Sequence, residues 1–167
     1  MTDIEKREKT VALLEELGIE VRLHEHGAVY TMEEVDRVCD RIYDNEIIAK
    51  NLFLKEHNEE KYYLIVVGGD KHADIKSVRR YLGTKPLSFA TEEQLVKILG
   101  VTRGAVTPLG IIFDKEGLVS VIVDEELRGD VLFGVHPCEN TSTVYLKYDE
   151  LEKIAAKFGR HLINMQV

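Results

Sequence analysis

Residues 134–143, GVHPCENTST, place a histidine, a cysteine, an asparagine and several hydroxyl side chains within one short segment. Cysteine hydrolases combine such groups, so Cys138 is a candidate nucleophile and His136 a candidate base. Residues two apart on a strand share a face, but Pro137 interrupts regular strand geometry between them. No cysteine-protease signature surrounds the pair. The favoured interpretation is therefore that Cys138 is a small, half-buried side chain without a chemical role.

Lys50 is a second candidate, because it is a lone cation in the apolar segment IIAKNLFL. Strand alternation would place it on one face with Ile48 and Leu52. If that face points inward, the ammonium requires an anion such as a phosphate or a carboxylate. If the strand lies at a sheet edge, the lysine instead protects against aggregation. These residues alone leave both interpretations open.

A third candidate is the loop GVTRGAVTPLG, residues 100–110. It has neither the spacing of a P-loop nor that of a dinucleotide-binding loop. Its glycines and Pro108 could still present backbone N–H groups to an oxyanion or a carbonyl. Spacing alone favours the simpler alternative, a plain connection between a helix and a strand.

The composition of the chain argues against a metal site, a disulfide framework and binding to long duplex DNA. The six histidines form no HExxH motif and the two cysteines, Cys39 and Cys138, form no CxxC pair, so neither a metal site nor a disulfide framework is predicted. The charged N-terminal segment and the lack of a long apolar run predict a cytoplasmic protein. The net charge of −8 argues against binding long duplex DNA, but a few local cations could still grip one nucleic-acid end.

Periodicity and turn residues indicate an α+β domain spanning residues 1–167, with a mixed, strongly curved sheet flanked by helices. Several connections are short hairpins, which a doubly wound parallel sheet would not contain. Helices are predicted at residues 4–17, 31–42, 74–83, 91–100 and 148–159. Strands are predicted at residues 19–26, 46–56, 61–69, 87–90, 130–136 and 141–147, with a hairpin over 110–124 that turns at 115–117.

Five motifs occur together in order: KNLFLK (50–55), GDK (69–71), LSFA (87–90), GVTRGAVTPLG (100–110) and HPCENTST (136–143). In this order and spacing they resemble the YbaK/ProX superfamily of aminoacyl-tRNA editing domains, and most closely its free-standing Ala-tRNA(Pro) deacylases. HEHGAVYTMEEV also resembles the HPPVFTVEEA segment of that family. The resemblance implies a mixed sheet curled into a partial barrel. It implies hydrolysis of the ester that joins a wrong amino acid to the 3′-terminal adenosine of tRNA, without a metal or cofactor.

The resemblance also implies roles for individual residues. Lys50 matches a lysine that holds the phosphate of the terminal nucleotide, and His136 matches a histidine that limits the size of the accepted side chain. The backbone of Gly100, Gly104 and Pro108 would position the acyl carbonyl and water. Arg103 stands where the family commonly has a proline, which loosens the turn and adds a cation near the predicted site. Further substrate-binding positions are Thr31, Asn51, Phe53, Val67, Asn140 and Thr141.

In this interpretation water attacks an activated ester with help from the vicinal ribose hydroxyl, without a covalent enzyme intermediate. The expected partners are the 3′ end of mischarged tRNA(Pro) and prolyl-tRNA synthetase. A second sieve is needed because binding alone discriminates only about 1–3 kcal/mol per methylene. The alternatives are a deacylase for Cys-tRNA(Pro) or another small residue, a non-catalytic protein that binds a tRNA end or an amino acid, and a cysteine hydrolase.

Overall fold

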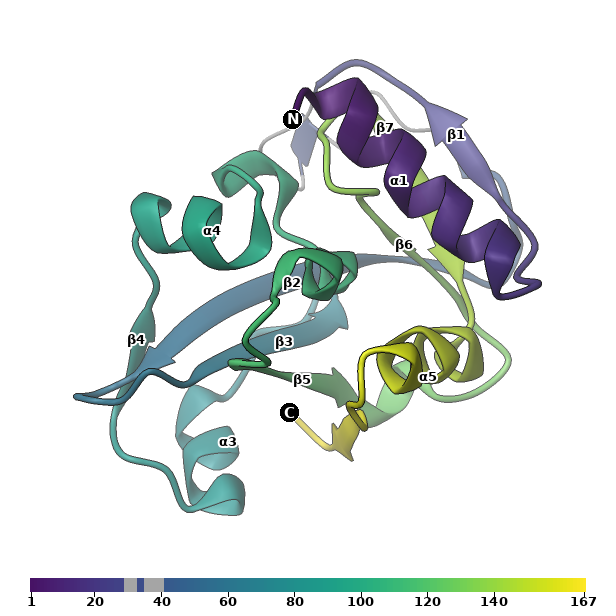
Figure 1. The fold of residues 1–167 in the computed structure, drawn as a ribbon. Helices are drawn as coiled ribbons and strands as arrows, with labels where there is room; N and C mark the ends of the chain where they lie inside the picture. The colour runs from purple at the N-terminus through teal and green to yellow at the C-terminus, as the bar shows by residue number, and fades with distance from the viewer. Residues whose placement is uncertain (29–32, 35–40) are drawn as a thin grey trace.

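The computed structural model describes residues 1–28, 33–34 and 41–167, and its centre is one mixed β-sheet (Figure 1). Within these residues the strand order is β1-β7-β6-β2-β3-β5-β8, and β4 also pairs with β2. The strands are β1 (Leu23–Glu25), β2 (Glu46–Glu56), β3 (Tyr62–Gly68), β4 (Leu87–Phe89), β5 (Val119–Asp124), β6 (Leu132–Val135), β7 (Ser142–Leu146) and β8 (Ile163–Met165).

The predicted fold class is confirmed. The pairs β2–β6, β3–β5 and β5–β8 are parallel, and the other pairs are antiparallel. The sheet is open, because β1 and β8 form its two ends and do not pair with each other in the described residues. The partial barrel is therefore a curved sheet that does not close.

Helices cover the sheet on both faces. They are α1 (Asp3–Glu16), α3 (Ile75–Leu82), α4 (Glu92–Leu99) and α5 (Tyr148–Lys157), with short 3-10 helices η1 (Arg103–Ala105), η2 (Pro108–Phe113) and η3 (Glu125–Leu127). The expected capping box of α4 is present, since the Thr91 side chain accepts from the Gln94 backbone N–H. The helix predicted at 31–42 falls mostly on residues outside the described ranges.

The predicted hairpin over residues 110–124 is wrong in its first half, because residues 108–113 form η2 instead of a strand. Pro108 occupies the first position of η2, and the Thr107 hydroxyl accepts from the Leu109 backbone N–H. Leu109, Gly110 and Ile111 are all buried. A short apolar run that is buried on every side does not reveal by its periodicity whether it is strand or helix.

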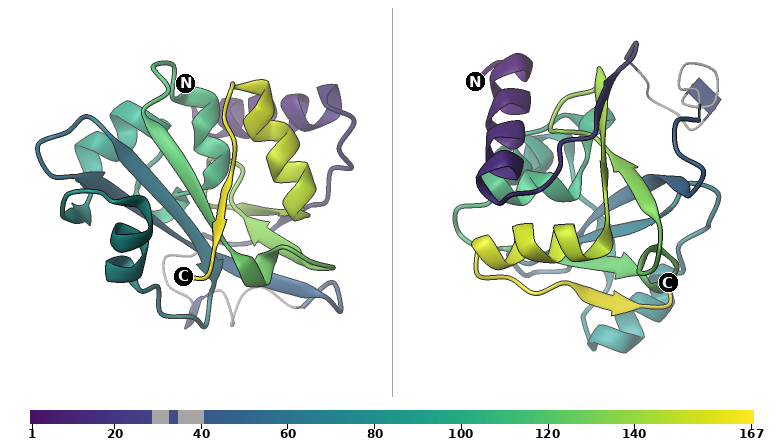
Figure 2. Two further views of the ribbon diagram at one scale, coloured as in Figure 1. Left: turned by 90° about the horizontal axis from the view of Figure 1, so that it is seen from below. Right: turned by 90° about the vertical axis from the view of Figure 1, so that its right-hand side faces the viewer.

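The two faces of the sheet bury different clusters. The antiparallel register of β2 and β3 pairs Phe53 with Leu64 on one face and Lys50 with Val67 on the other. Phe53 and Leu64 belong to the larger core, which packs against α1, α4, η2 and α5. Val67 belongs to a smaller cluster that packs against Val78 of α3. Figures 1 and 2 show α3 on one side of the strands, and α1, α4 and α5 on the other.

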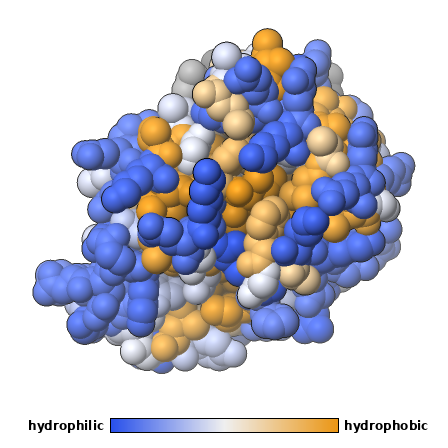
Figure 3. All heavy atoms as spheres, viewed as in Figure 1, coloured by the Kyte–Doolittle hydropathy of each residue, from blue (hydrophilic) through white to orange (hydrophobic). Residues whose placement is uncertain are grey.

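The larger core is covered by a mostly polar exterior. Figure 3, in the view of Figure 1, shows hydrophilic residues surrounding hydrophobic ones on the surface. The core contains most of the fully buried large side chains, including Leu99, Leu109 and Ile111. Burial of this kind is the dominant favourable contribution to folding.

Candidate active site

The edge of β2 that faces away from β3 is only partly paired. It pairs with β6 at residues 46–48 and with β4 at residues 54–56. Beyond that second ladder, the Phe53 carbonyl accepts from the Ala90 backbone N–H at 3.0 Å. Among the described residues, 49–52 therefore lie between two ladders, with no strand on this edge. Unpaired strand edges are exposed backbone that other groups can approach, and Lys50 and Asn51 lie in this gap.

The Lys50 ammonium is half-buried and donates a hydrogen bond to the backbone carbonyl of Lys71. No carboxylate of the described residues lies within 4.0 Å of it. A carbonyl satisfies one of the three ammonium donors and leaves the positive charge uncompensated. The position is therefore suited to an anion, and the phosphate contact stays a prediction.

His136 is held in one neutral form. Its Nδ1 lies 2.9 Å from the Ser142 carbonyl, and because a carbonyl can only accept, Nδ1 carries the proton. Burial lowers the pKa of His136, and the neighbouring His26 lowers it further, against the opposing effect of the Ser142 carbonyl and Glu139. The ring is therefore neutral at pH 7 and keeps the lone pair of Nε2 for an incoming donor.

Strand register and alternation place Lys50 and His136 on the same face of the sheet, just beyond the last paired residues of β2 and β6. Ile48 of β2 pairs with Gly134 of β6 in parallel, and Lys50 and His136 are each two residues further along. The His136 ring lies 6.1 Å from that of His26, whose Nε2 is 2.8 Å from Thr143 Oγ1. These contacts place His136 on the face that Thr143 and Gly134 share.

Gly134 forms the floor of this face. A Cβ at this position would lie 2.9 Å from Thr143 Cγ2, 3.0 Å from Ile48 Cδ1 and 3.2 Å from Tyr145 Cε1. Beside it, the rings of His24, Tyr43 and Tyr145 meet edge to face. Sequence reasoning missed this aromatic group, because its members come from three separate segments and no local motif joins them.

Glu139 was also missed, although it organises the turn after β6. Its buried carboxylate accepts from the Thr141 backbone N–H at 2.6 Å, from the Thr141 hydroxyl at 2.5 Å and from the Ser142 hydroxyl. Burial raises the pKa of Glu139, but these hydrogen bonds and Arg7 outweigh it, so the net pKa is lowered. The charged Glu139 thereby fixes Ser142, whose carbonyl orients His136. A carboxylate followed by Thr and Ser was the available signal.

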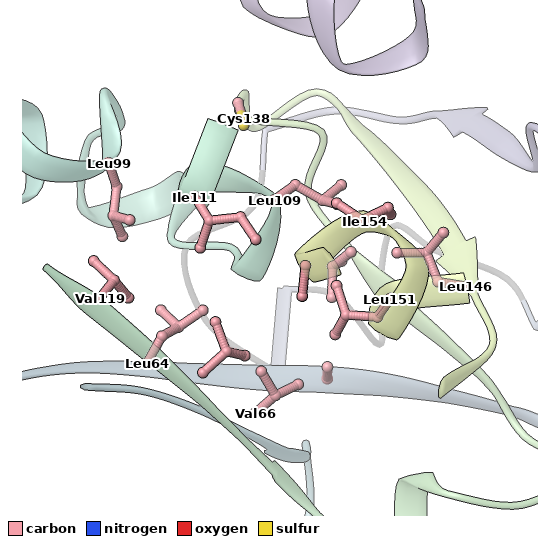
Figure 4. Close-up of a cluster of buried hydrophobic side chains, with 14 of the residues drawn as sticks. Leu64, Val66, Leu99, Leu109, Ile111, Val119, Cys138, Leu146, Leu151 and Ile154 are labelled. Carbon is pink, nitrogen blue, oxygen red and sulfur yellow. The ribbon is translucent and has the colours of Figure 1, made fainter. Parts of the chain in front are cut away.

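Cys138 faces the opposite way from His136. It is 1% exposed and belongs to the larger core, at whose edge Figure 4 shows it. Burial raises the pKa of its thiol to about 12, even though Thr10 of α1 and Lys6 act to lower it. The thiol is therefore protonated at neutral pH, which removes the nucleophilic thiolate. The geometry favours the interpretation of Cys138 as a packing residue.

The Gly100–Pro108 loop packs on the side of the larger core. Gly100 ends α4 with φ +66°, and Ala105 and Pro108 are buried. Gly104 is half-buried. The Arg103 side chain is 82% exposed and lies 3.6 Å from Glu92 at the start of α4. The proposed positioning of an acyl group by this backbone stays a prediction.

The remaining predicted substrate-binding residues are divided between the two faces. Phe53 stacks on Tyr62 in the larger core with ring centroids 5.2 Å apart, on the face opposite to Lys50. Val67 is fully buried beside Lys50. Asn51 points to the same face as Phe53, and its buried Oδ1 has no hydrogen-bond partner in the described residues. Asn140 and Thr141 lie in the turn after β6, and Thr31 falls outside the described ranges.

Residues 1–28, 33–34 and 41–167 contain neither a group of metal-ligating side chains nor a helix that could span a membrane. No three His, Cys, Asp or Glu side chains come together in a group that could hold a metal ion. No helix is long and apolar enough to cross a membrane.

The open mixed sheet with this polar face matches a known class of domain. Residues 26–154 match the family model described as "Aminoacyl-tRNA editing domain", and the chain belongs to this family. It is 39% identical over 157 residues to "Prolyl-tRNA editing protein ProX" of Acetoanaerobium sticklandii, covering 94% of each chain. It is 32% identical over 143 residues to "Prolyl-tRNA synthetase associated domain-containing protein 1" of Danio rerio, covering 84% of this chain and 76% of that one.

A solved structure agrees with the fold. The crystal structure of "a putative trans-editing enzyme for prolyl tRNA synthetase" superimposes with a TM-score of 0.70 at 19% identity, covering 97% of each chain. At this identity the likeness concerns the fold, and it confirms the arrangement of strands and helices expected for an editing domain.

Proposed function

We propose that this protein is a trans-editing hydrolase that cleaves the ester of mischarged tRNA(Pro), with Ala-tRNA(Pro) as its main substrate. The observation that supports the proposal is that the Lys50 ammonium and a neutral His136 lie on the same face of the sheet, where β2 and β6 stop pairing. Membership of the aminoacyl-tRNA editing family supports it, as does the similarity to a prolyl-tRNA editing protein. An activity of this kind belongs in the cytoplasm, where tRNA is charged.

Lys50 would anchor the substrate. Its uncompensated charge suits a phosphate of the terminal nucleotide, and its bond to the Lys71 carbonyl restricts where the ammonium can lie. Charge-assisted hydrogen bonds of this type are roughly twice as strong as neutral ones. A fixed phosphate would restrict where the terminal ribose lies relative to His136. The free energy of phosphate binding would thereby help to position the ester for attack.

His136 would measure the amino acid and orient it. The Ser142 carbonyl holds its Nδ1–H, so the ring cannot rotate without losing that bond, and Nε2 would be the acceptor offered to the substrate. A ring held in this way would limit the size of the side chain that is accepted. Admitting alanine and excluding proline in this way would provide a second sieve, which is needed because a synthetase discriminates poorly between similar amino acids by binding alone.

The hydrolytic step would use water and no enzyme nucleophile. The Cys138 thiol is protonated and faces the larger core, so an acyl-enzyme on this residue is not part of the mechanism. The ester is already activated, and the vicinal hydroxyl of the tRNA ribose would help to activate the water. The Gly100–Pro108 loop packs against the larger core, so its backbone would have to reach the ester past the unpaired edge of β2 in order to polarise the carbonyl.

A panel of tRNA(Pro) charged with alanine, cysteine, serine or proline tests the proposal directly. We expect fastest deacylation with alanine and no acceleration with proline over the enzyme-free rate. Faster release of cysteine would reassign the substrate to Cys-tRNA(Pro). If Ala-tRNA(Pro) stays intact at enzyme excess, the protein is not a hydrolase of this substrate. It would then be a protein that binds the tRNA end, in partnership with prolyl-tRNA synthetase or another enzyme.

A further inference from the structure

The LSFA motif contains an aromatic side chain for which the reaction gives no role. Phe89 in β4 is 64% exposed, although a large apolar side chain gains from burial. It pairs with Leu54 of β2, so it lies on the same face as Lys50, four residues further along that strand. A base of single-stranded nucleic acid could stack on a ring in this position.

The segment that leads into this motif is basic, in contrast to the chain as a whole. Residues 71–85 contain five Lys or Arg and one Asp, whereas the whole chain has 22 Lys and Arg against 30 Asp and Glu. In the described residues, Lys71 pairs with Asp124 and Lys85 with Glu59. No carboxylate of those residues lies within 4.0 Å of the three remaining cations, which are Lys76, Arg79 and Arg80.

These three cations line one depression in the surface. It has a volume of about 480 Å³ and is formed by Lys76, Arg79, Arg80, Gly83 and Thr84. Arg79 and Arg80 also stand in the last turn of α3, where a cation stabilises a helix, so their presence has a structural explanation. Lys76 has none of this kind, because it stands in the first turn, where the helix dipole favours acidic residues.

The depression, Phe89 and Lys50 belong to one face of the sheet, and together they are called the basic path. α3 packs on the face of the sheet that carries Lys50, because its Val78 contacts the cluster of Val67. The C-terminal end of α3 leads through residues 83–86 directly into β4. Since the Lys71 carbonyl before α3 accepts from Lys50, α3 begins near the Lys50 site and ends near β4, which carries Phe89.

We propose that this path is the docking surface for the tRNA acceptor end, with Phe89 stacking on an unpaired nucleotide and the α3 depression holding phosphates of the acceptor stem. The inference rests on the proposed function, since it takes the acylated terminus to lie at Lys50. It explains how an acidic protein can bind a polyanion. The net negative charge repels nucleic acid over most of the surface, and the basic path provides a local region that attracts it.

The test compares two substrates, full-length Ala-tRNA(Pro) and a 3′-alanylated CCA trinucleotide that lacks the stem. Lys76→Glu should raise KM about tenfold for the full-length substrate, and should lower the slope of log KM against log salt by about one. It should leave the trinucleotide unchanged. Glu in the first turn suits the helix dipole, so this variant should fold normally. Phe89→Ala should raise KM about tenfold for both substrates.

The matched control is Lys153→Glu, the same charge reversal at an exposed position of α5 on the opposite face. It should change neither KM. Equal effects of Lys76→Glu and Lys153→Glu would overturn the docking surface, as would an unchanged KM of Lys76→Glu with full-length tRNA. Binding of uncharged tRNA(Pro), measured by fluorescence anisotropy, separates the two proposals. If the wild type binds without hydrolysing Ala-tRNA(Pro), the function fails while the same variants still test the surface.

Discussion

The two faces of the sheet differ in what their side chains have to satisfy. On the face beneath α1, α4 and α5, side chains such as Phe53 and Leu64 pack among apolar neighbours. On the opposite face, Lys50 and His136 retain a charge and a lone pair that no carboxylate or donor of the described residues neutralises. The apolar core is stable without a ligand. The polar groups on the other face satisfy their remaining hydrogen-bonding capacity only when a ligand binds.

The segment His136–Cys138 crosses from one face to the other within three residues. His136 lies on the polar face with a lowered pKa, and Cys138 lies in the larger core with a raised pKa. Cys138 has φ +66°, a left-handed conformation that is rare for a side chain with a Cβ. The backbone therefore turns sharply enough to separate two residues that an extended strand would have placed together.

The largest expected effect is on the polar face of β2. Lys50→Ala should lower kcat/KM for Ala-tRNA(Pro) about 10- to 100-fold, because a hydrogen bond to a charged group contributes about 1.5–3 kcal/mol. Lys55→Ala is the matched control, since Lys55 lies on the same strand, faces the other way and makes a 3.8 Å ion pair with Glu60. Equal rates for the two variants would remove the distinction between the faces.

Gly134→Ala probes how tightly the polar face is packed. The added Cβ would lie within 3.0 Å of Thr143 and Ile48, so we expect a loss of about 1–3 kcal/mol in the free energy of unfolding. Urea denaturation measures it. Gly129→Ala provides the comparison, because a Cβ there meets no atom within 4 Å and stability should change by less than about 0.5 kcal/mol. Similar losses of unfolding free energy in the two variants would mean that the surroundings of Gly134 are not close-packed.

Cys138→Ala tests the assignment of the thiol to the larger core. Deacylation should stay within about twofold of the wild type, and stability should fall by about 1 kcal/mol. Cys138→Gly should be no less stable than the alanine variant, since glycine adopts φ +66° without steric cost. Loss of activity in a folded Cys138→Ala protein would restore the cysteine nucleophile.

The smallest effect concerns pH and His136. Since its pKa is lowered below the ordinary value of about 6.5, activity that depends on the neutral ring should stay constant from pH 8 to pH 6.5 and fall at lower pH. The unfolded chain binds the proton more readily, so this histidine's contribution to stability is present above pH 6.5 and is lost as the pH falls. His136→Asn should flatten that part of the stability profile, and an unchanged profile would contradict the shift.

Much of the fold followed from local patterns. The capping box of Thr91 and Gln94 and the strand of residues 46–56 were predicted from spacing and are present. The strand predicted at 110–113 was wrong, because a short apolar run that is largely buried shows no periodicity that distinguishes a strand from a helix. For the candidate site, Lys50 and His136 share a face of the sheet, and their roles stay predictions, whereas Glu139 and the ring of His26 were not anticipated. Their roles depend on contacts across the sheet that no single segment encodes.

The sequence by itself determined the types of residue, the periodicity of the elements and the ordered motifs of the editing family, because these are local properties of the chain. Only the tertiary structure decided which side of the sheet each of them faces. It put Lys50 and His136 on one face, turned Cys138 into the core and put Phe89 on the face that α3 covers. The physical reason is that strand register and a left-handed turn set side-chain direction, and both arise from pairings between residues far apart in the chain.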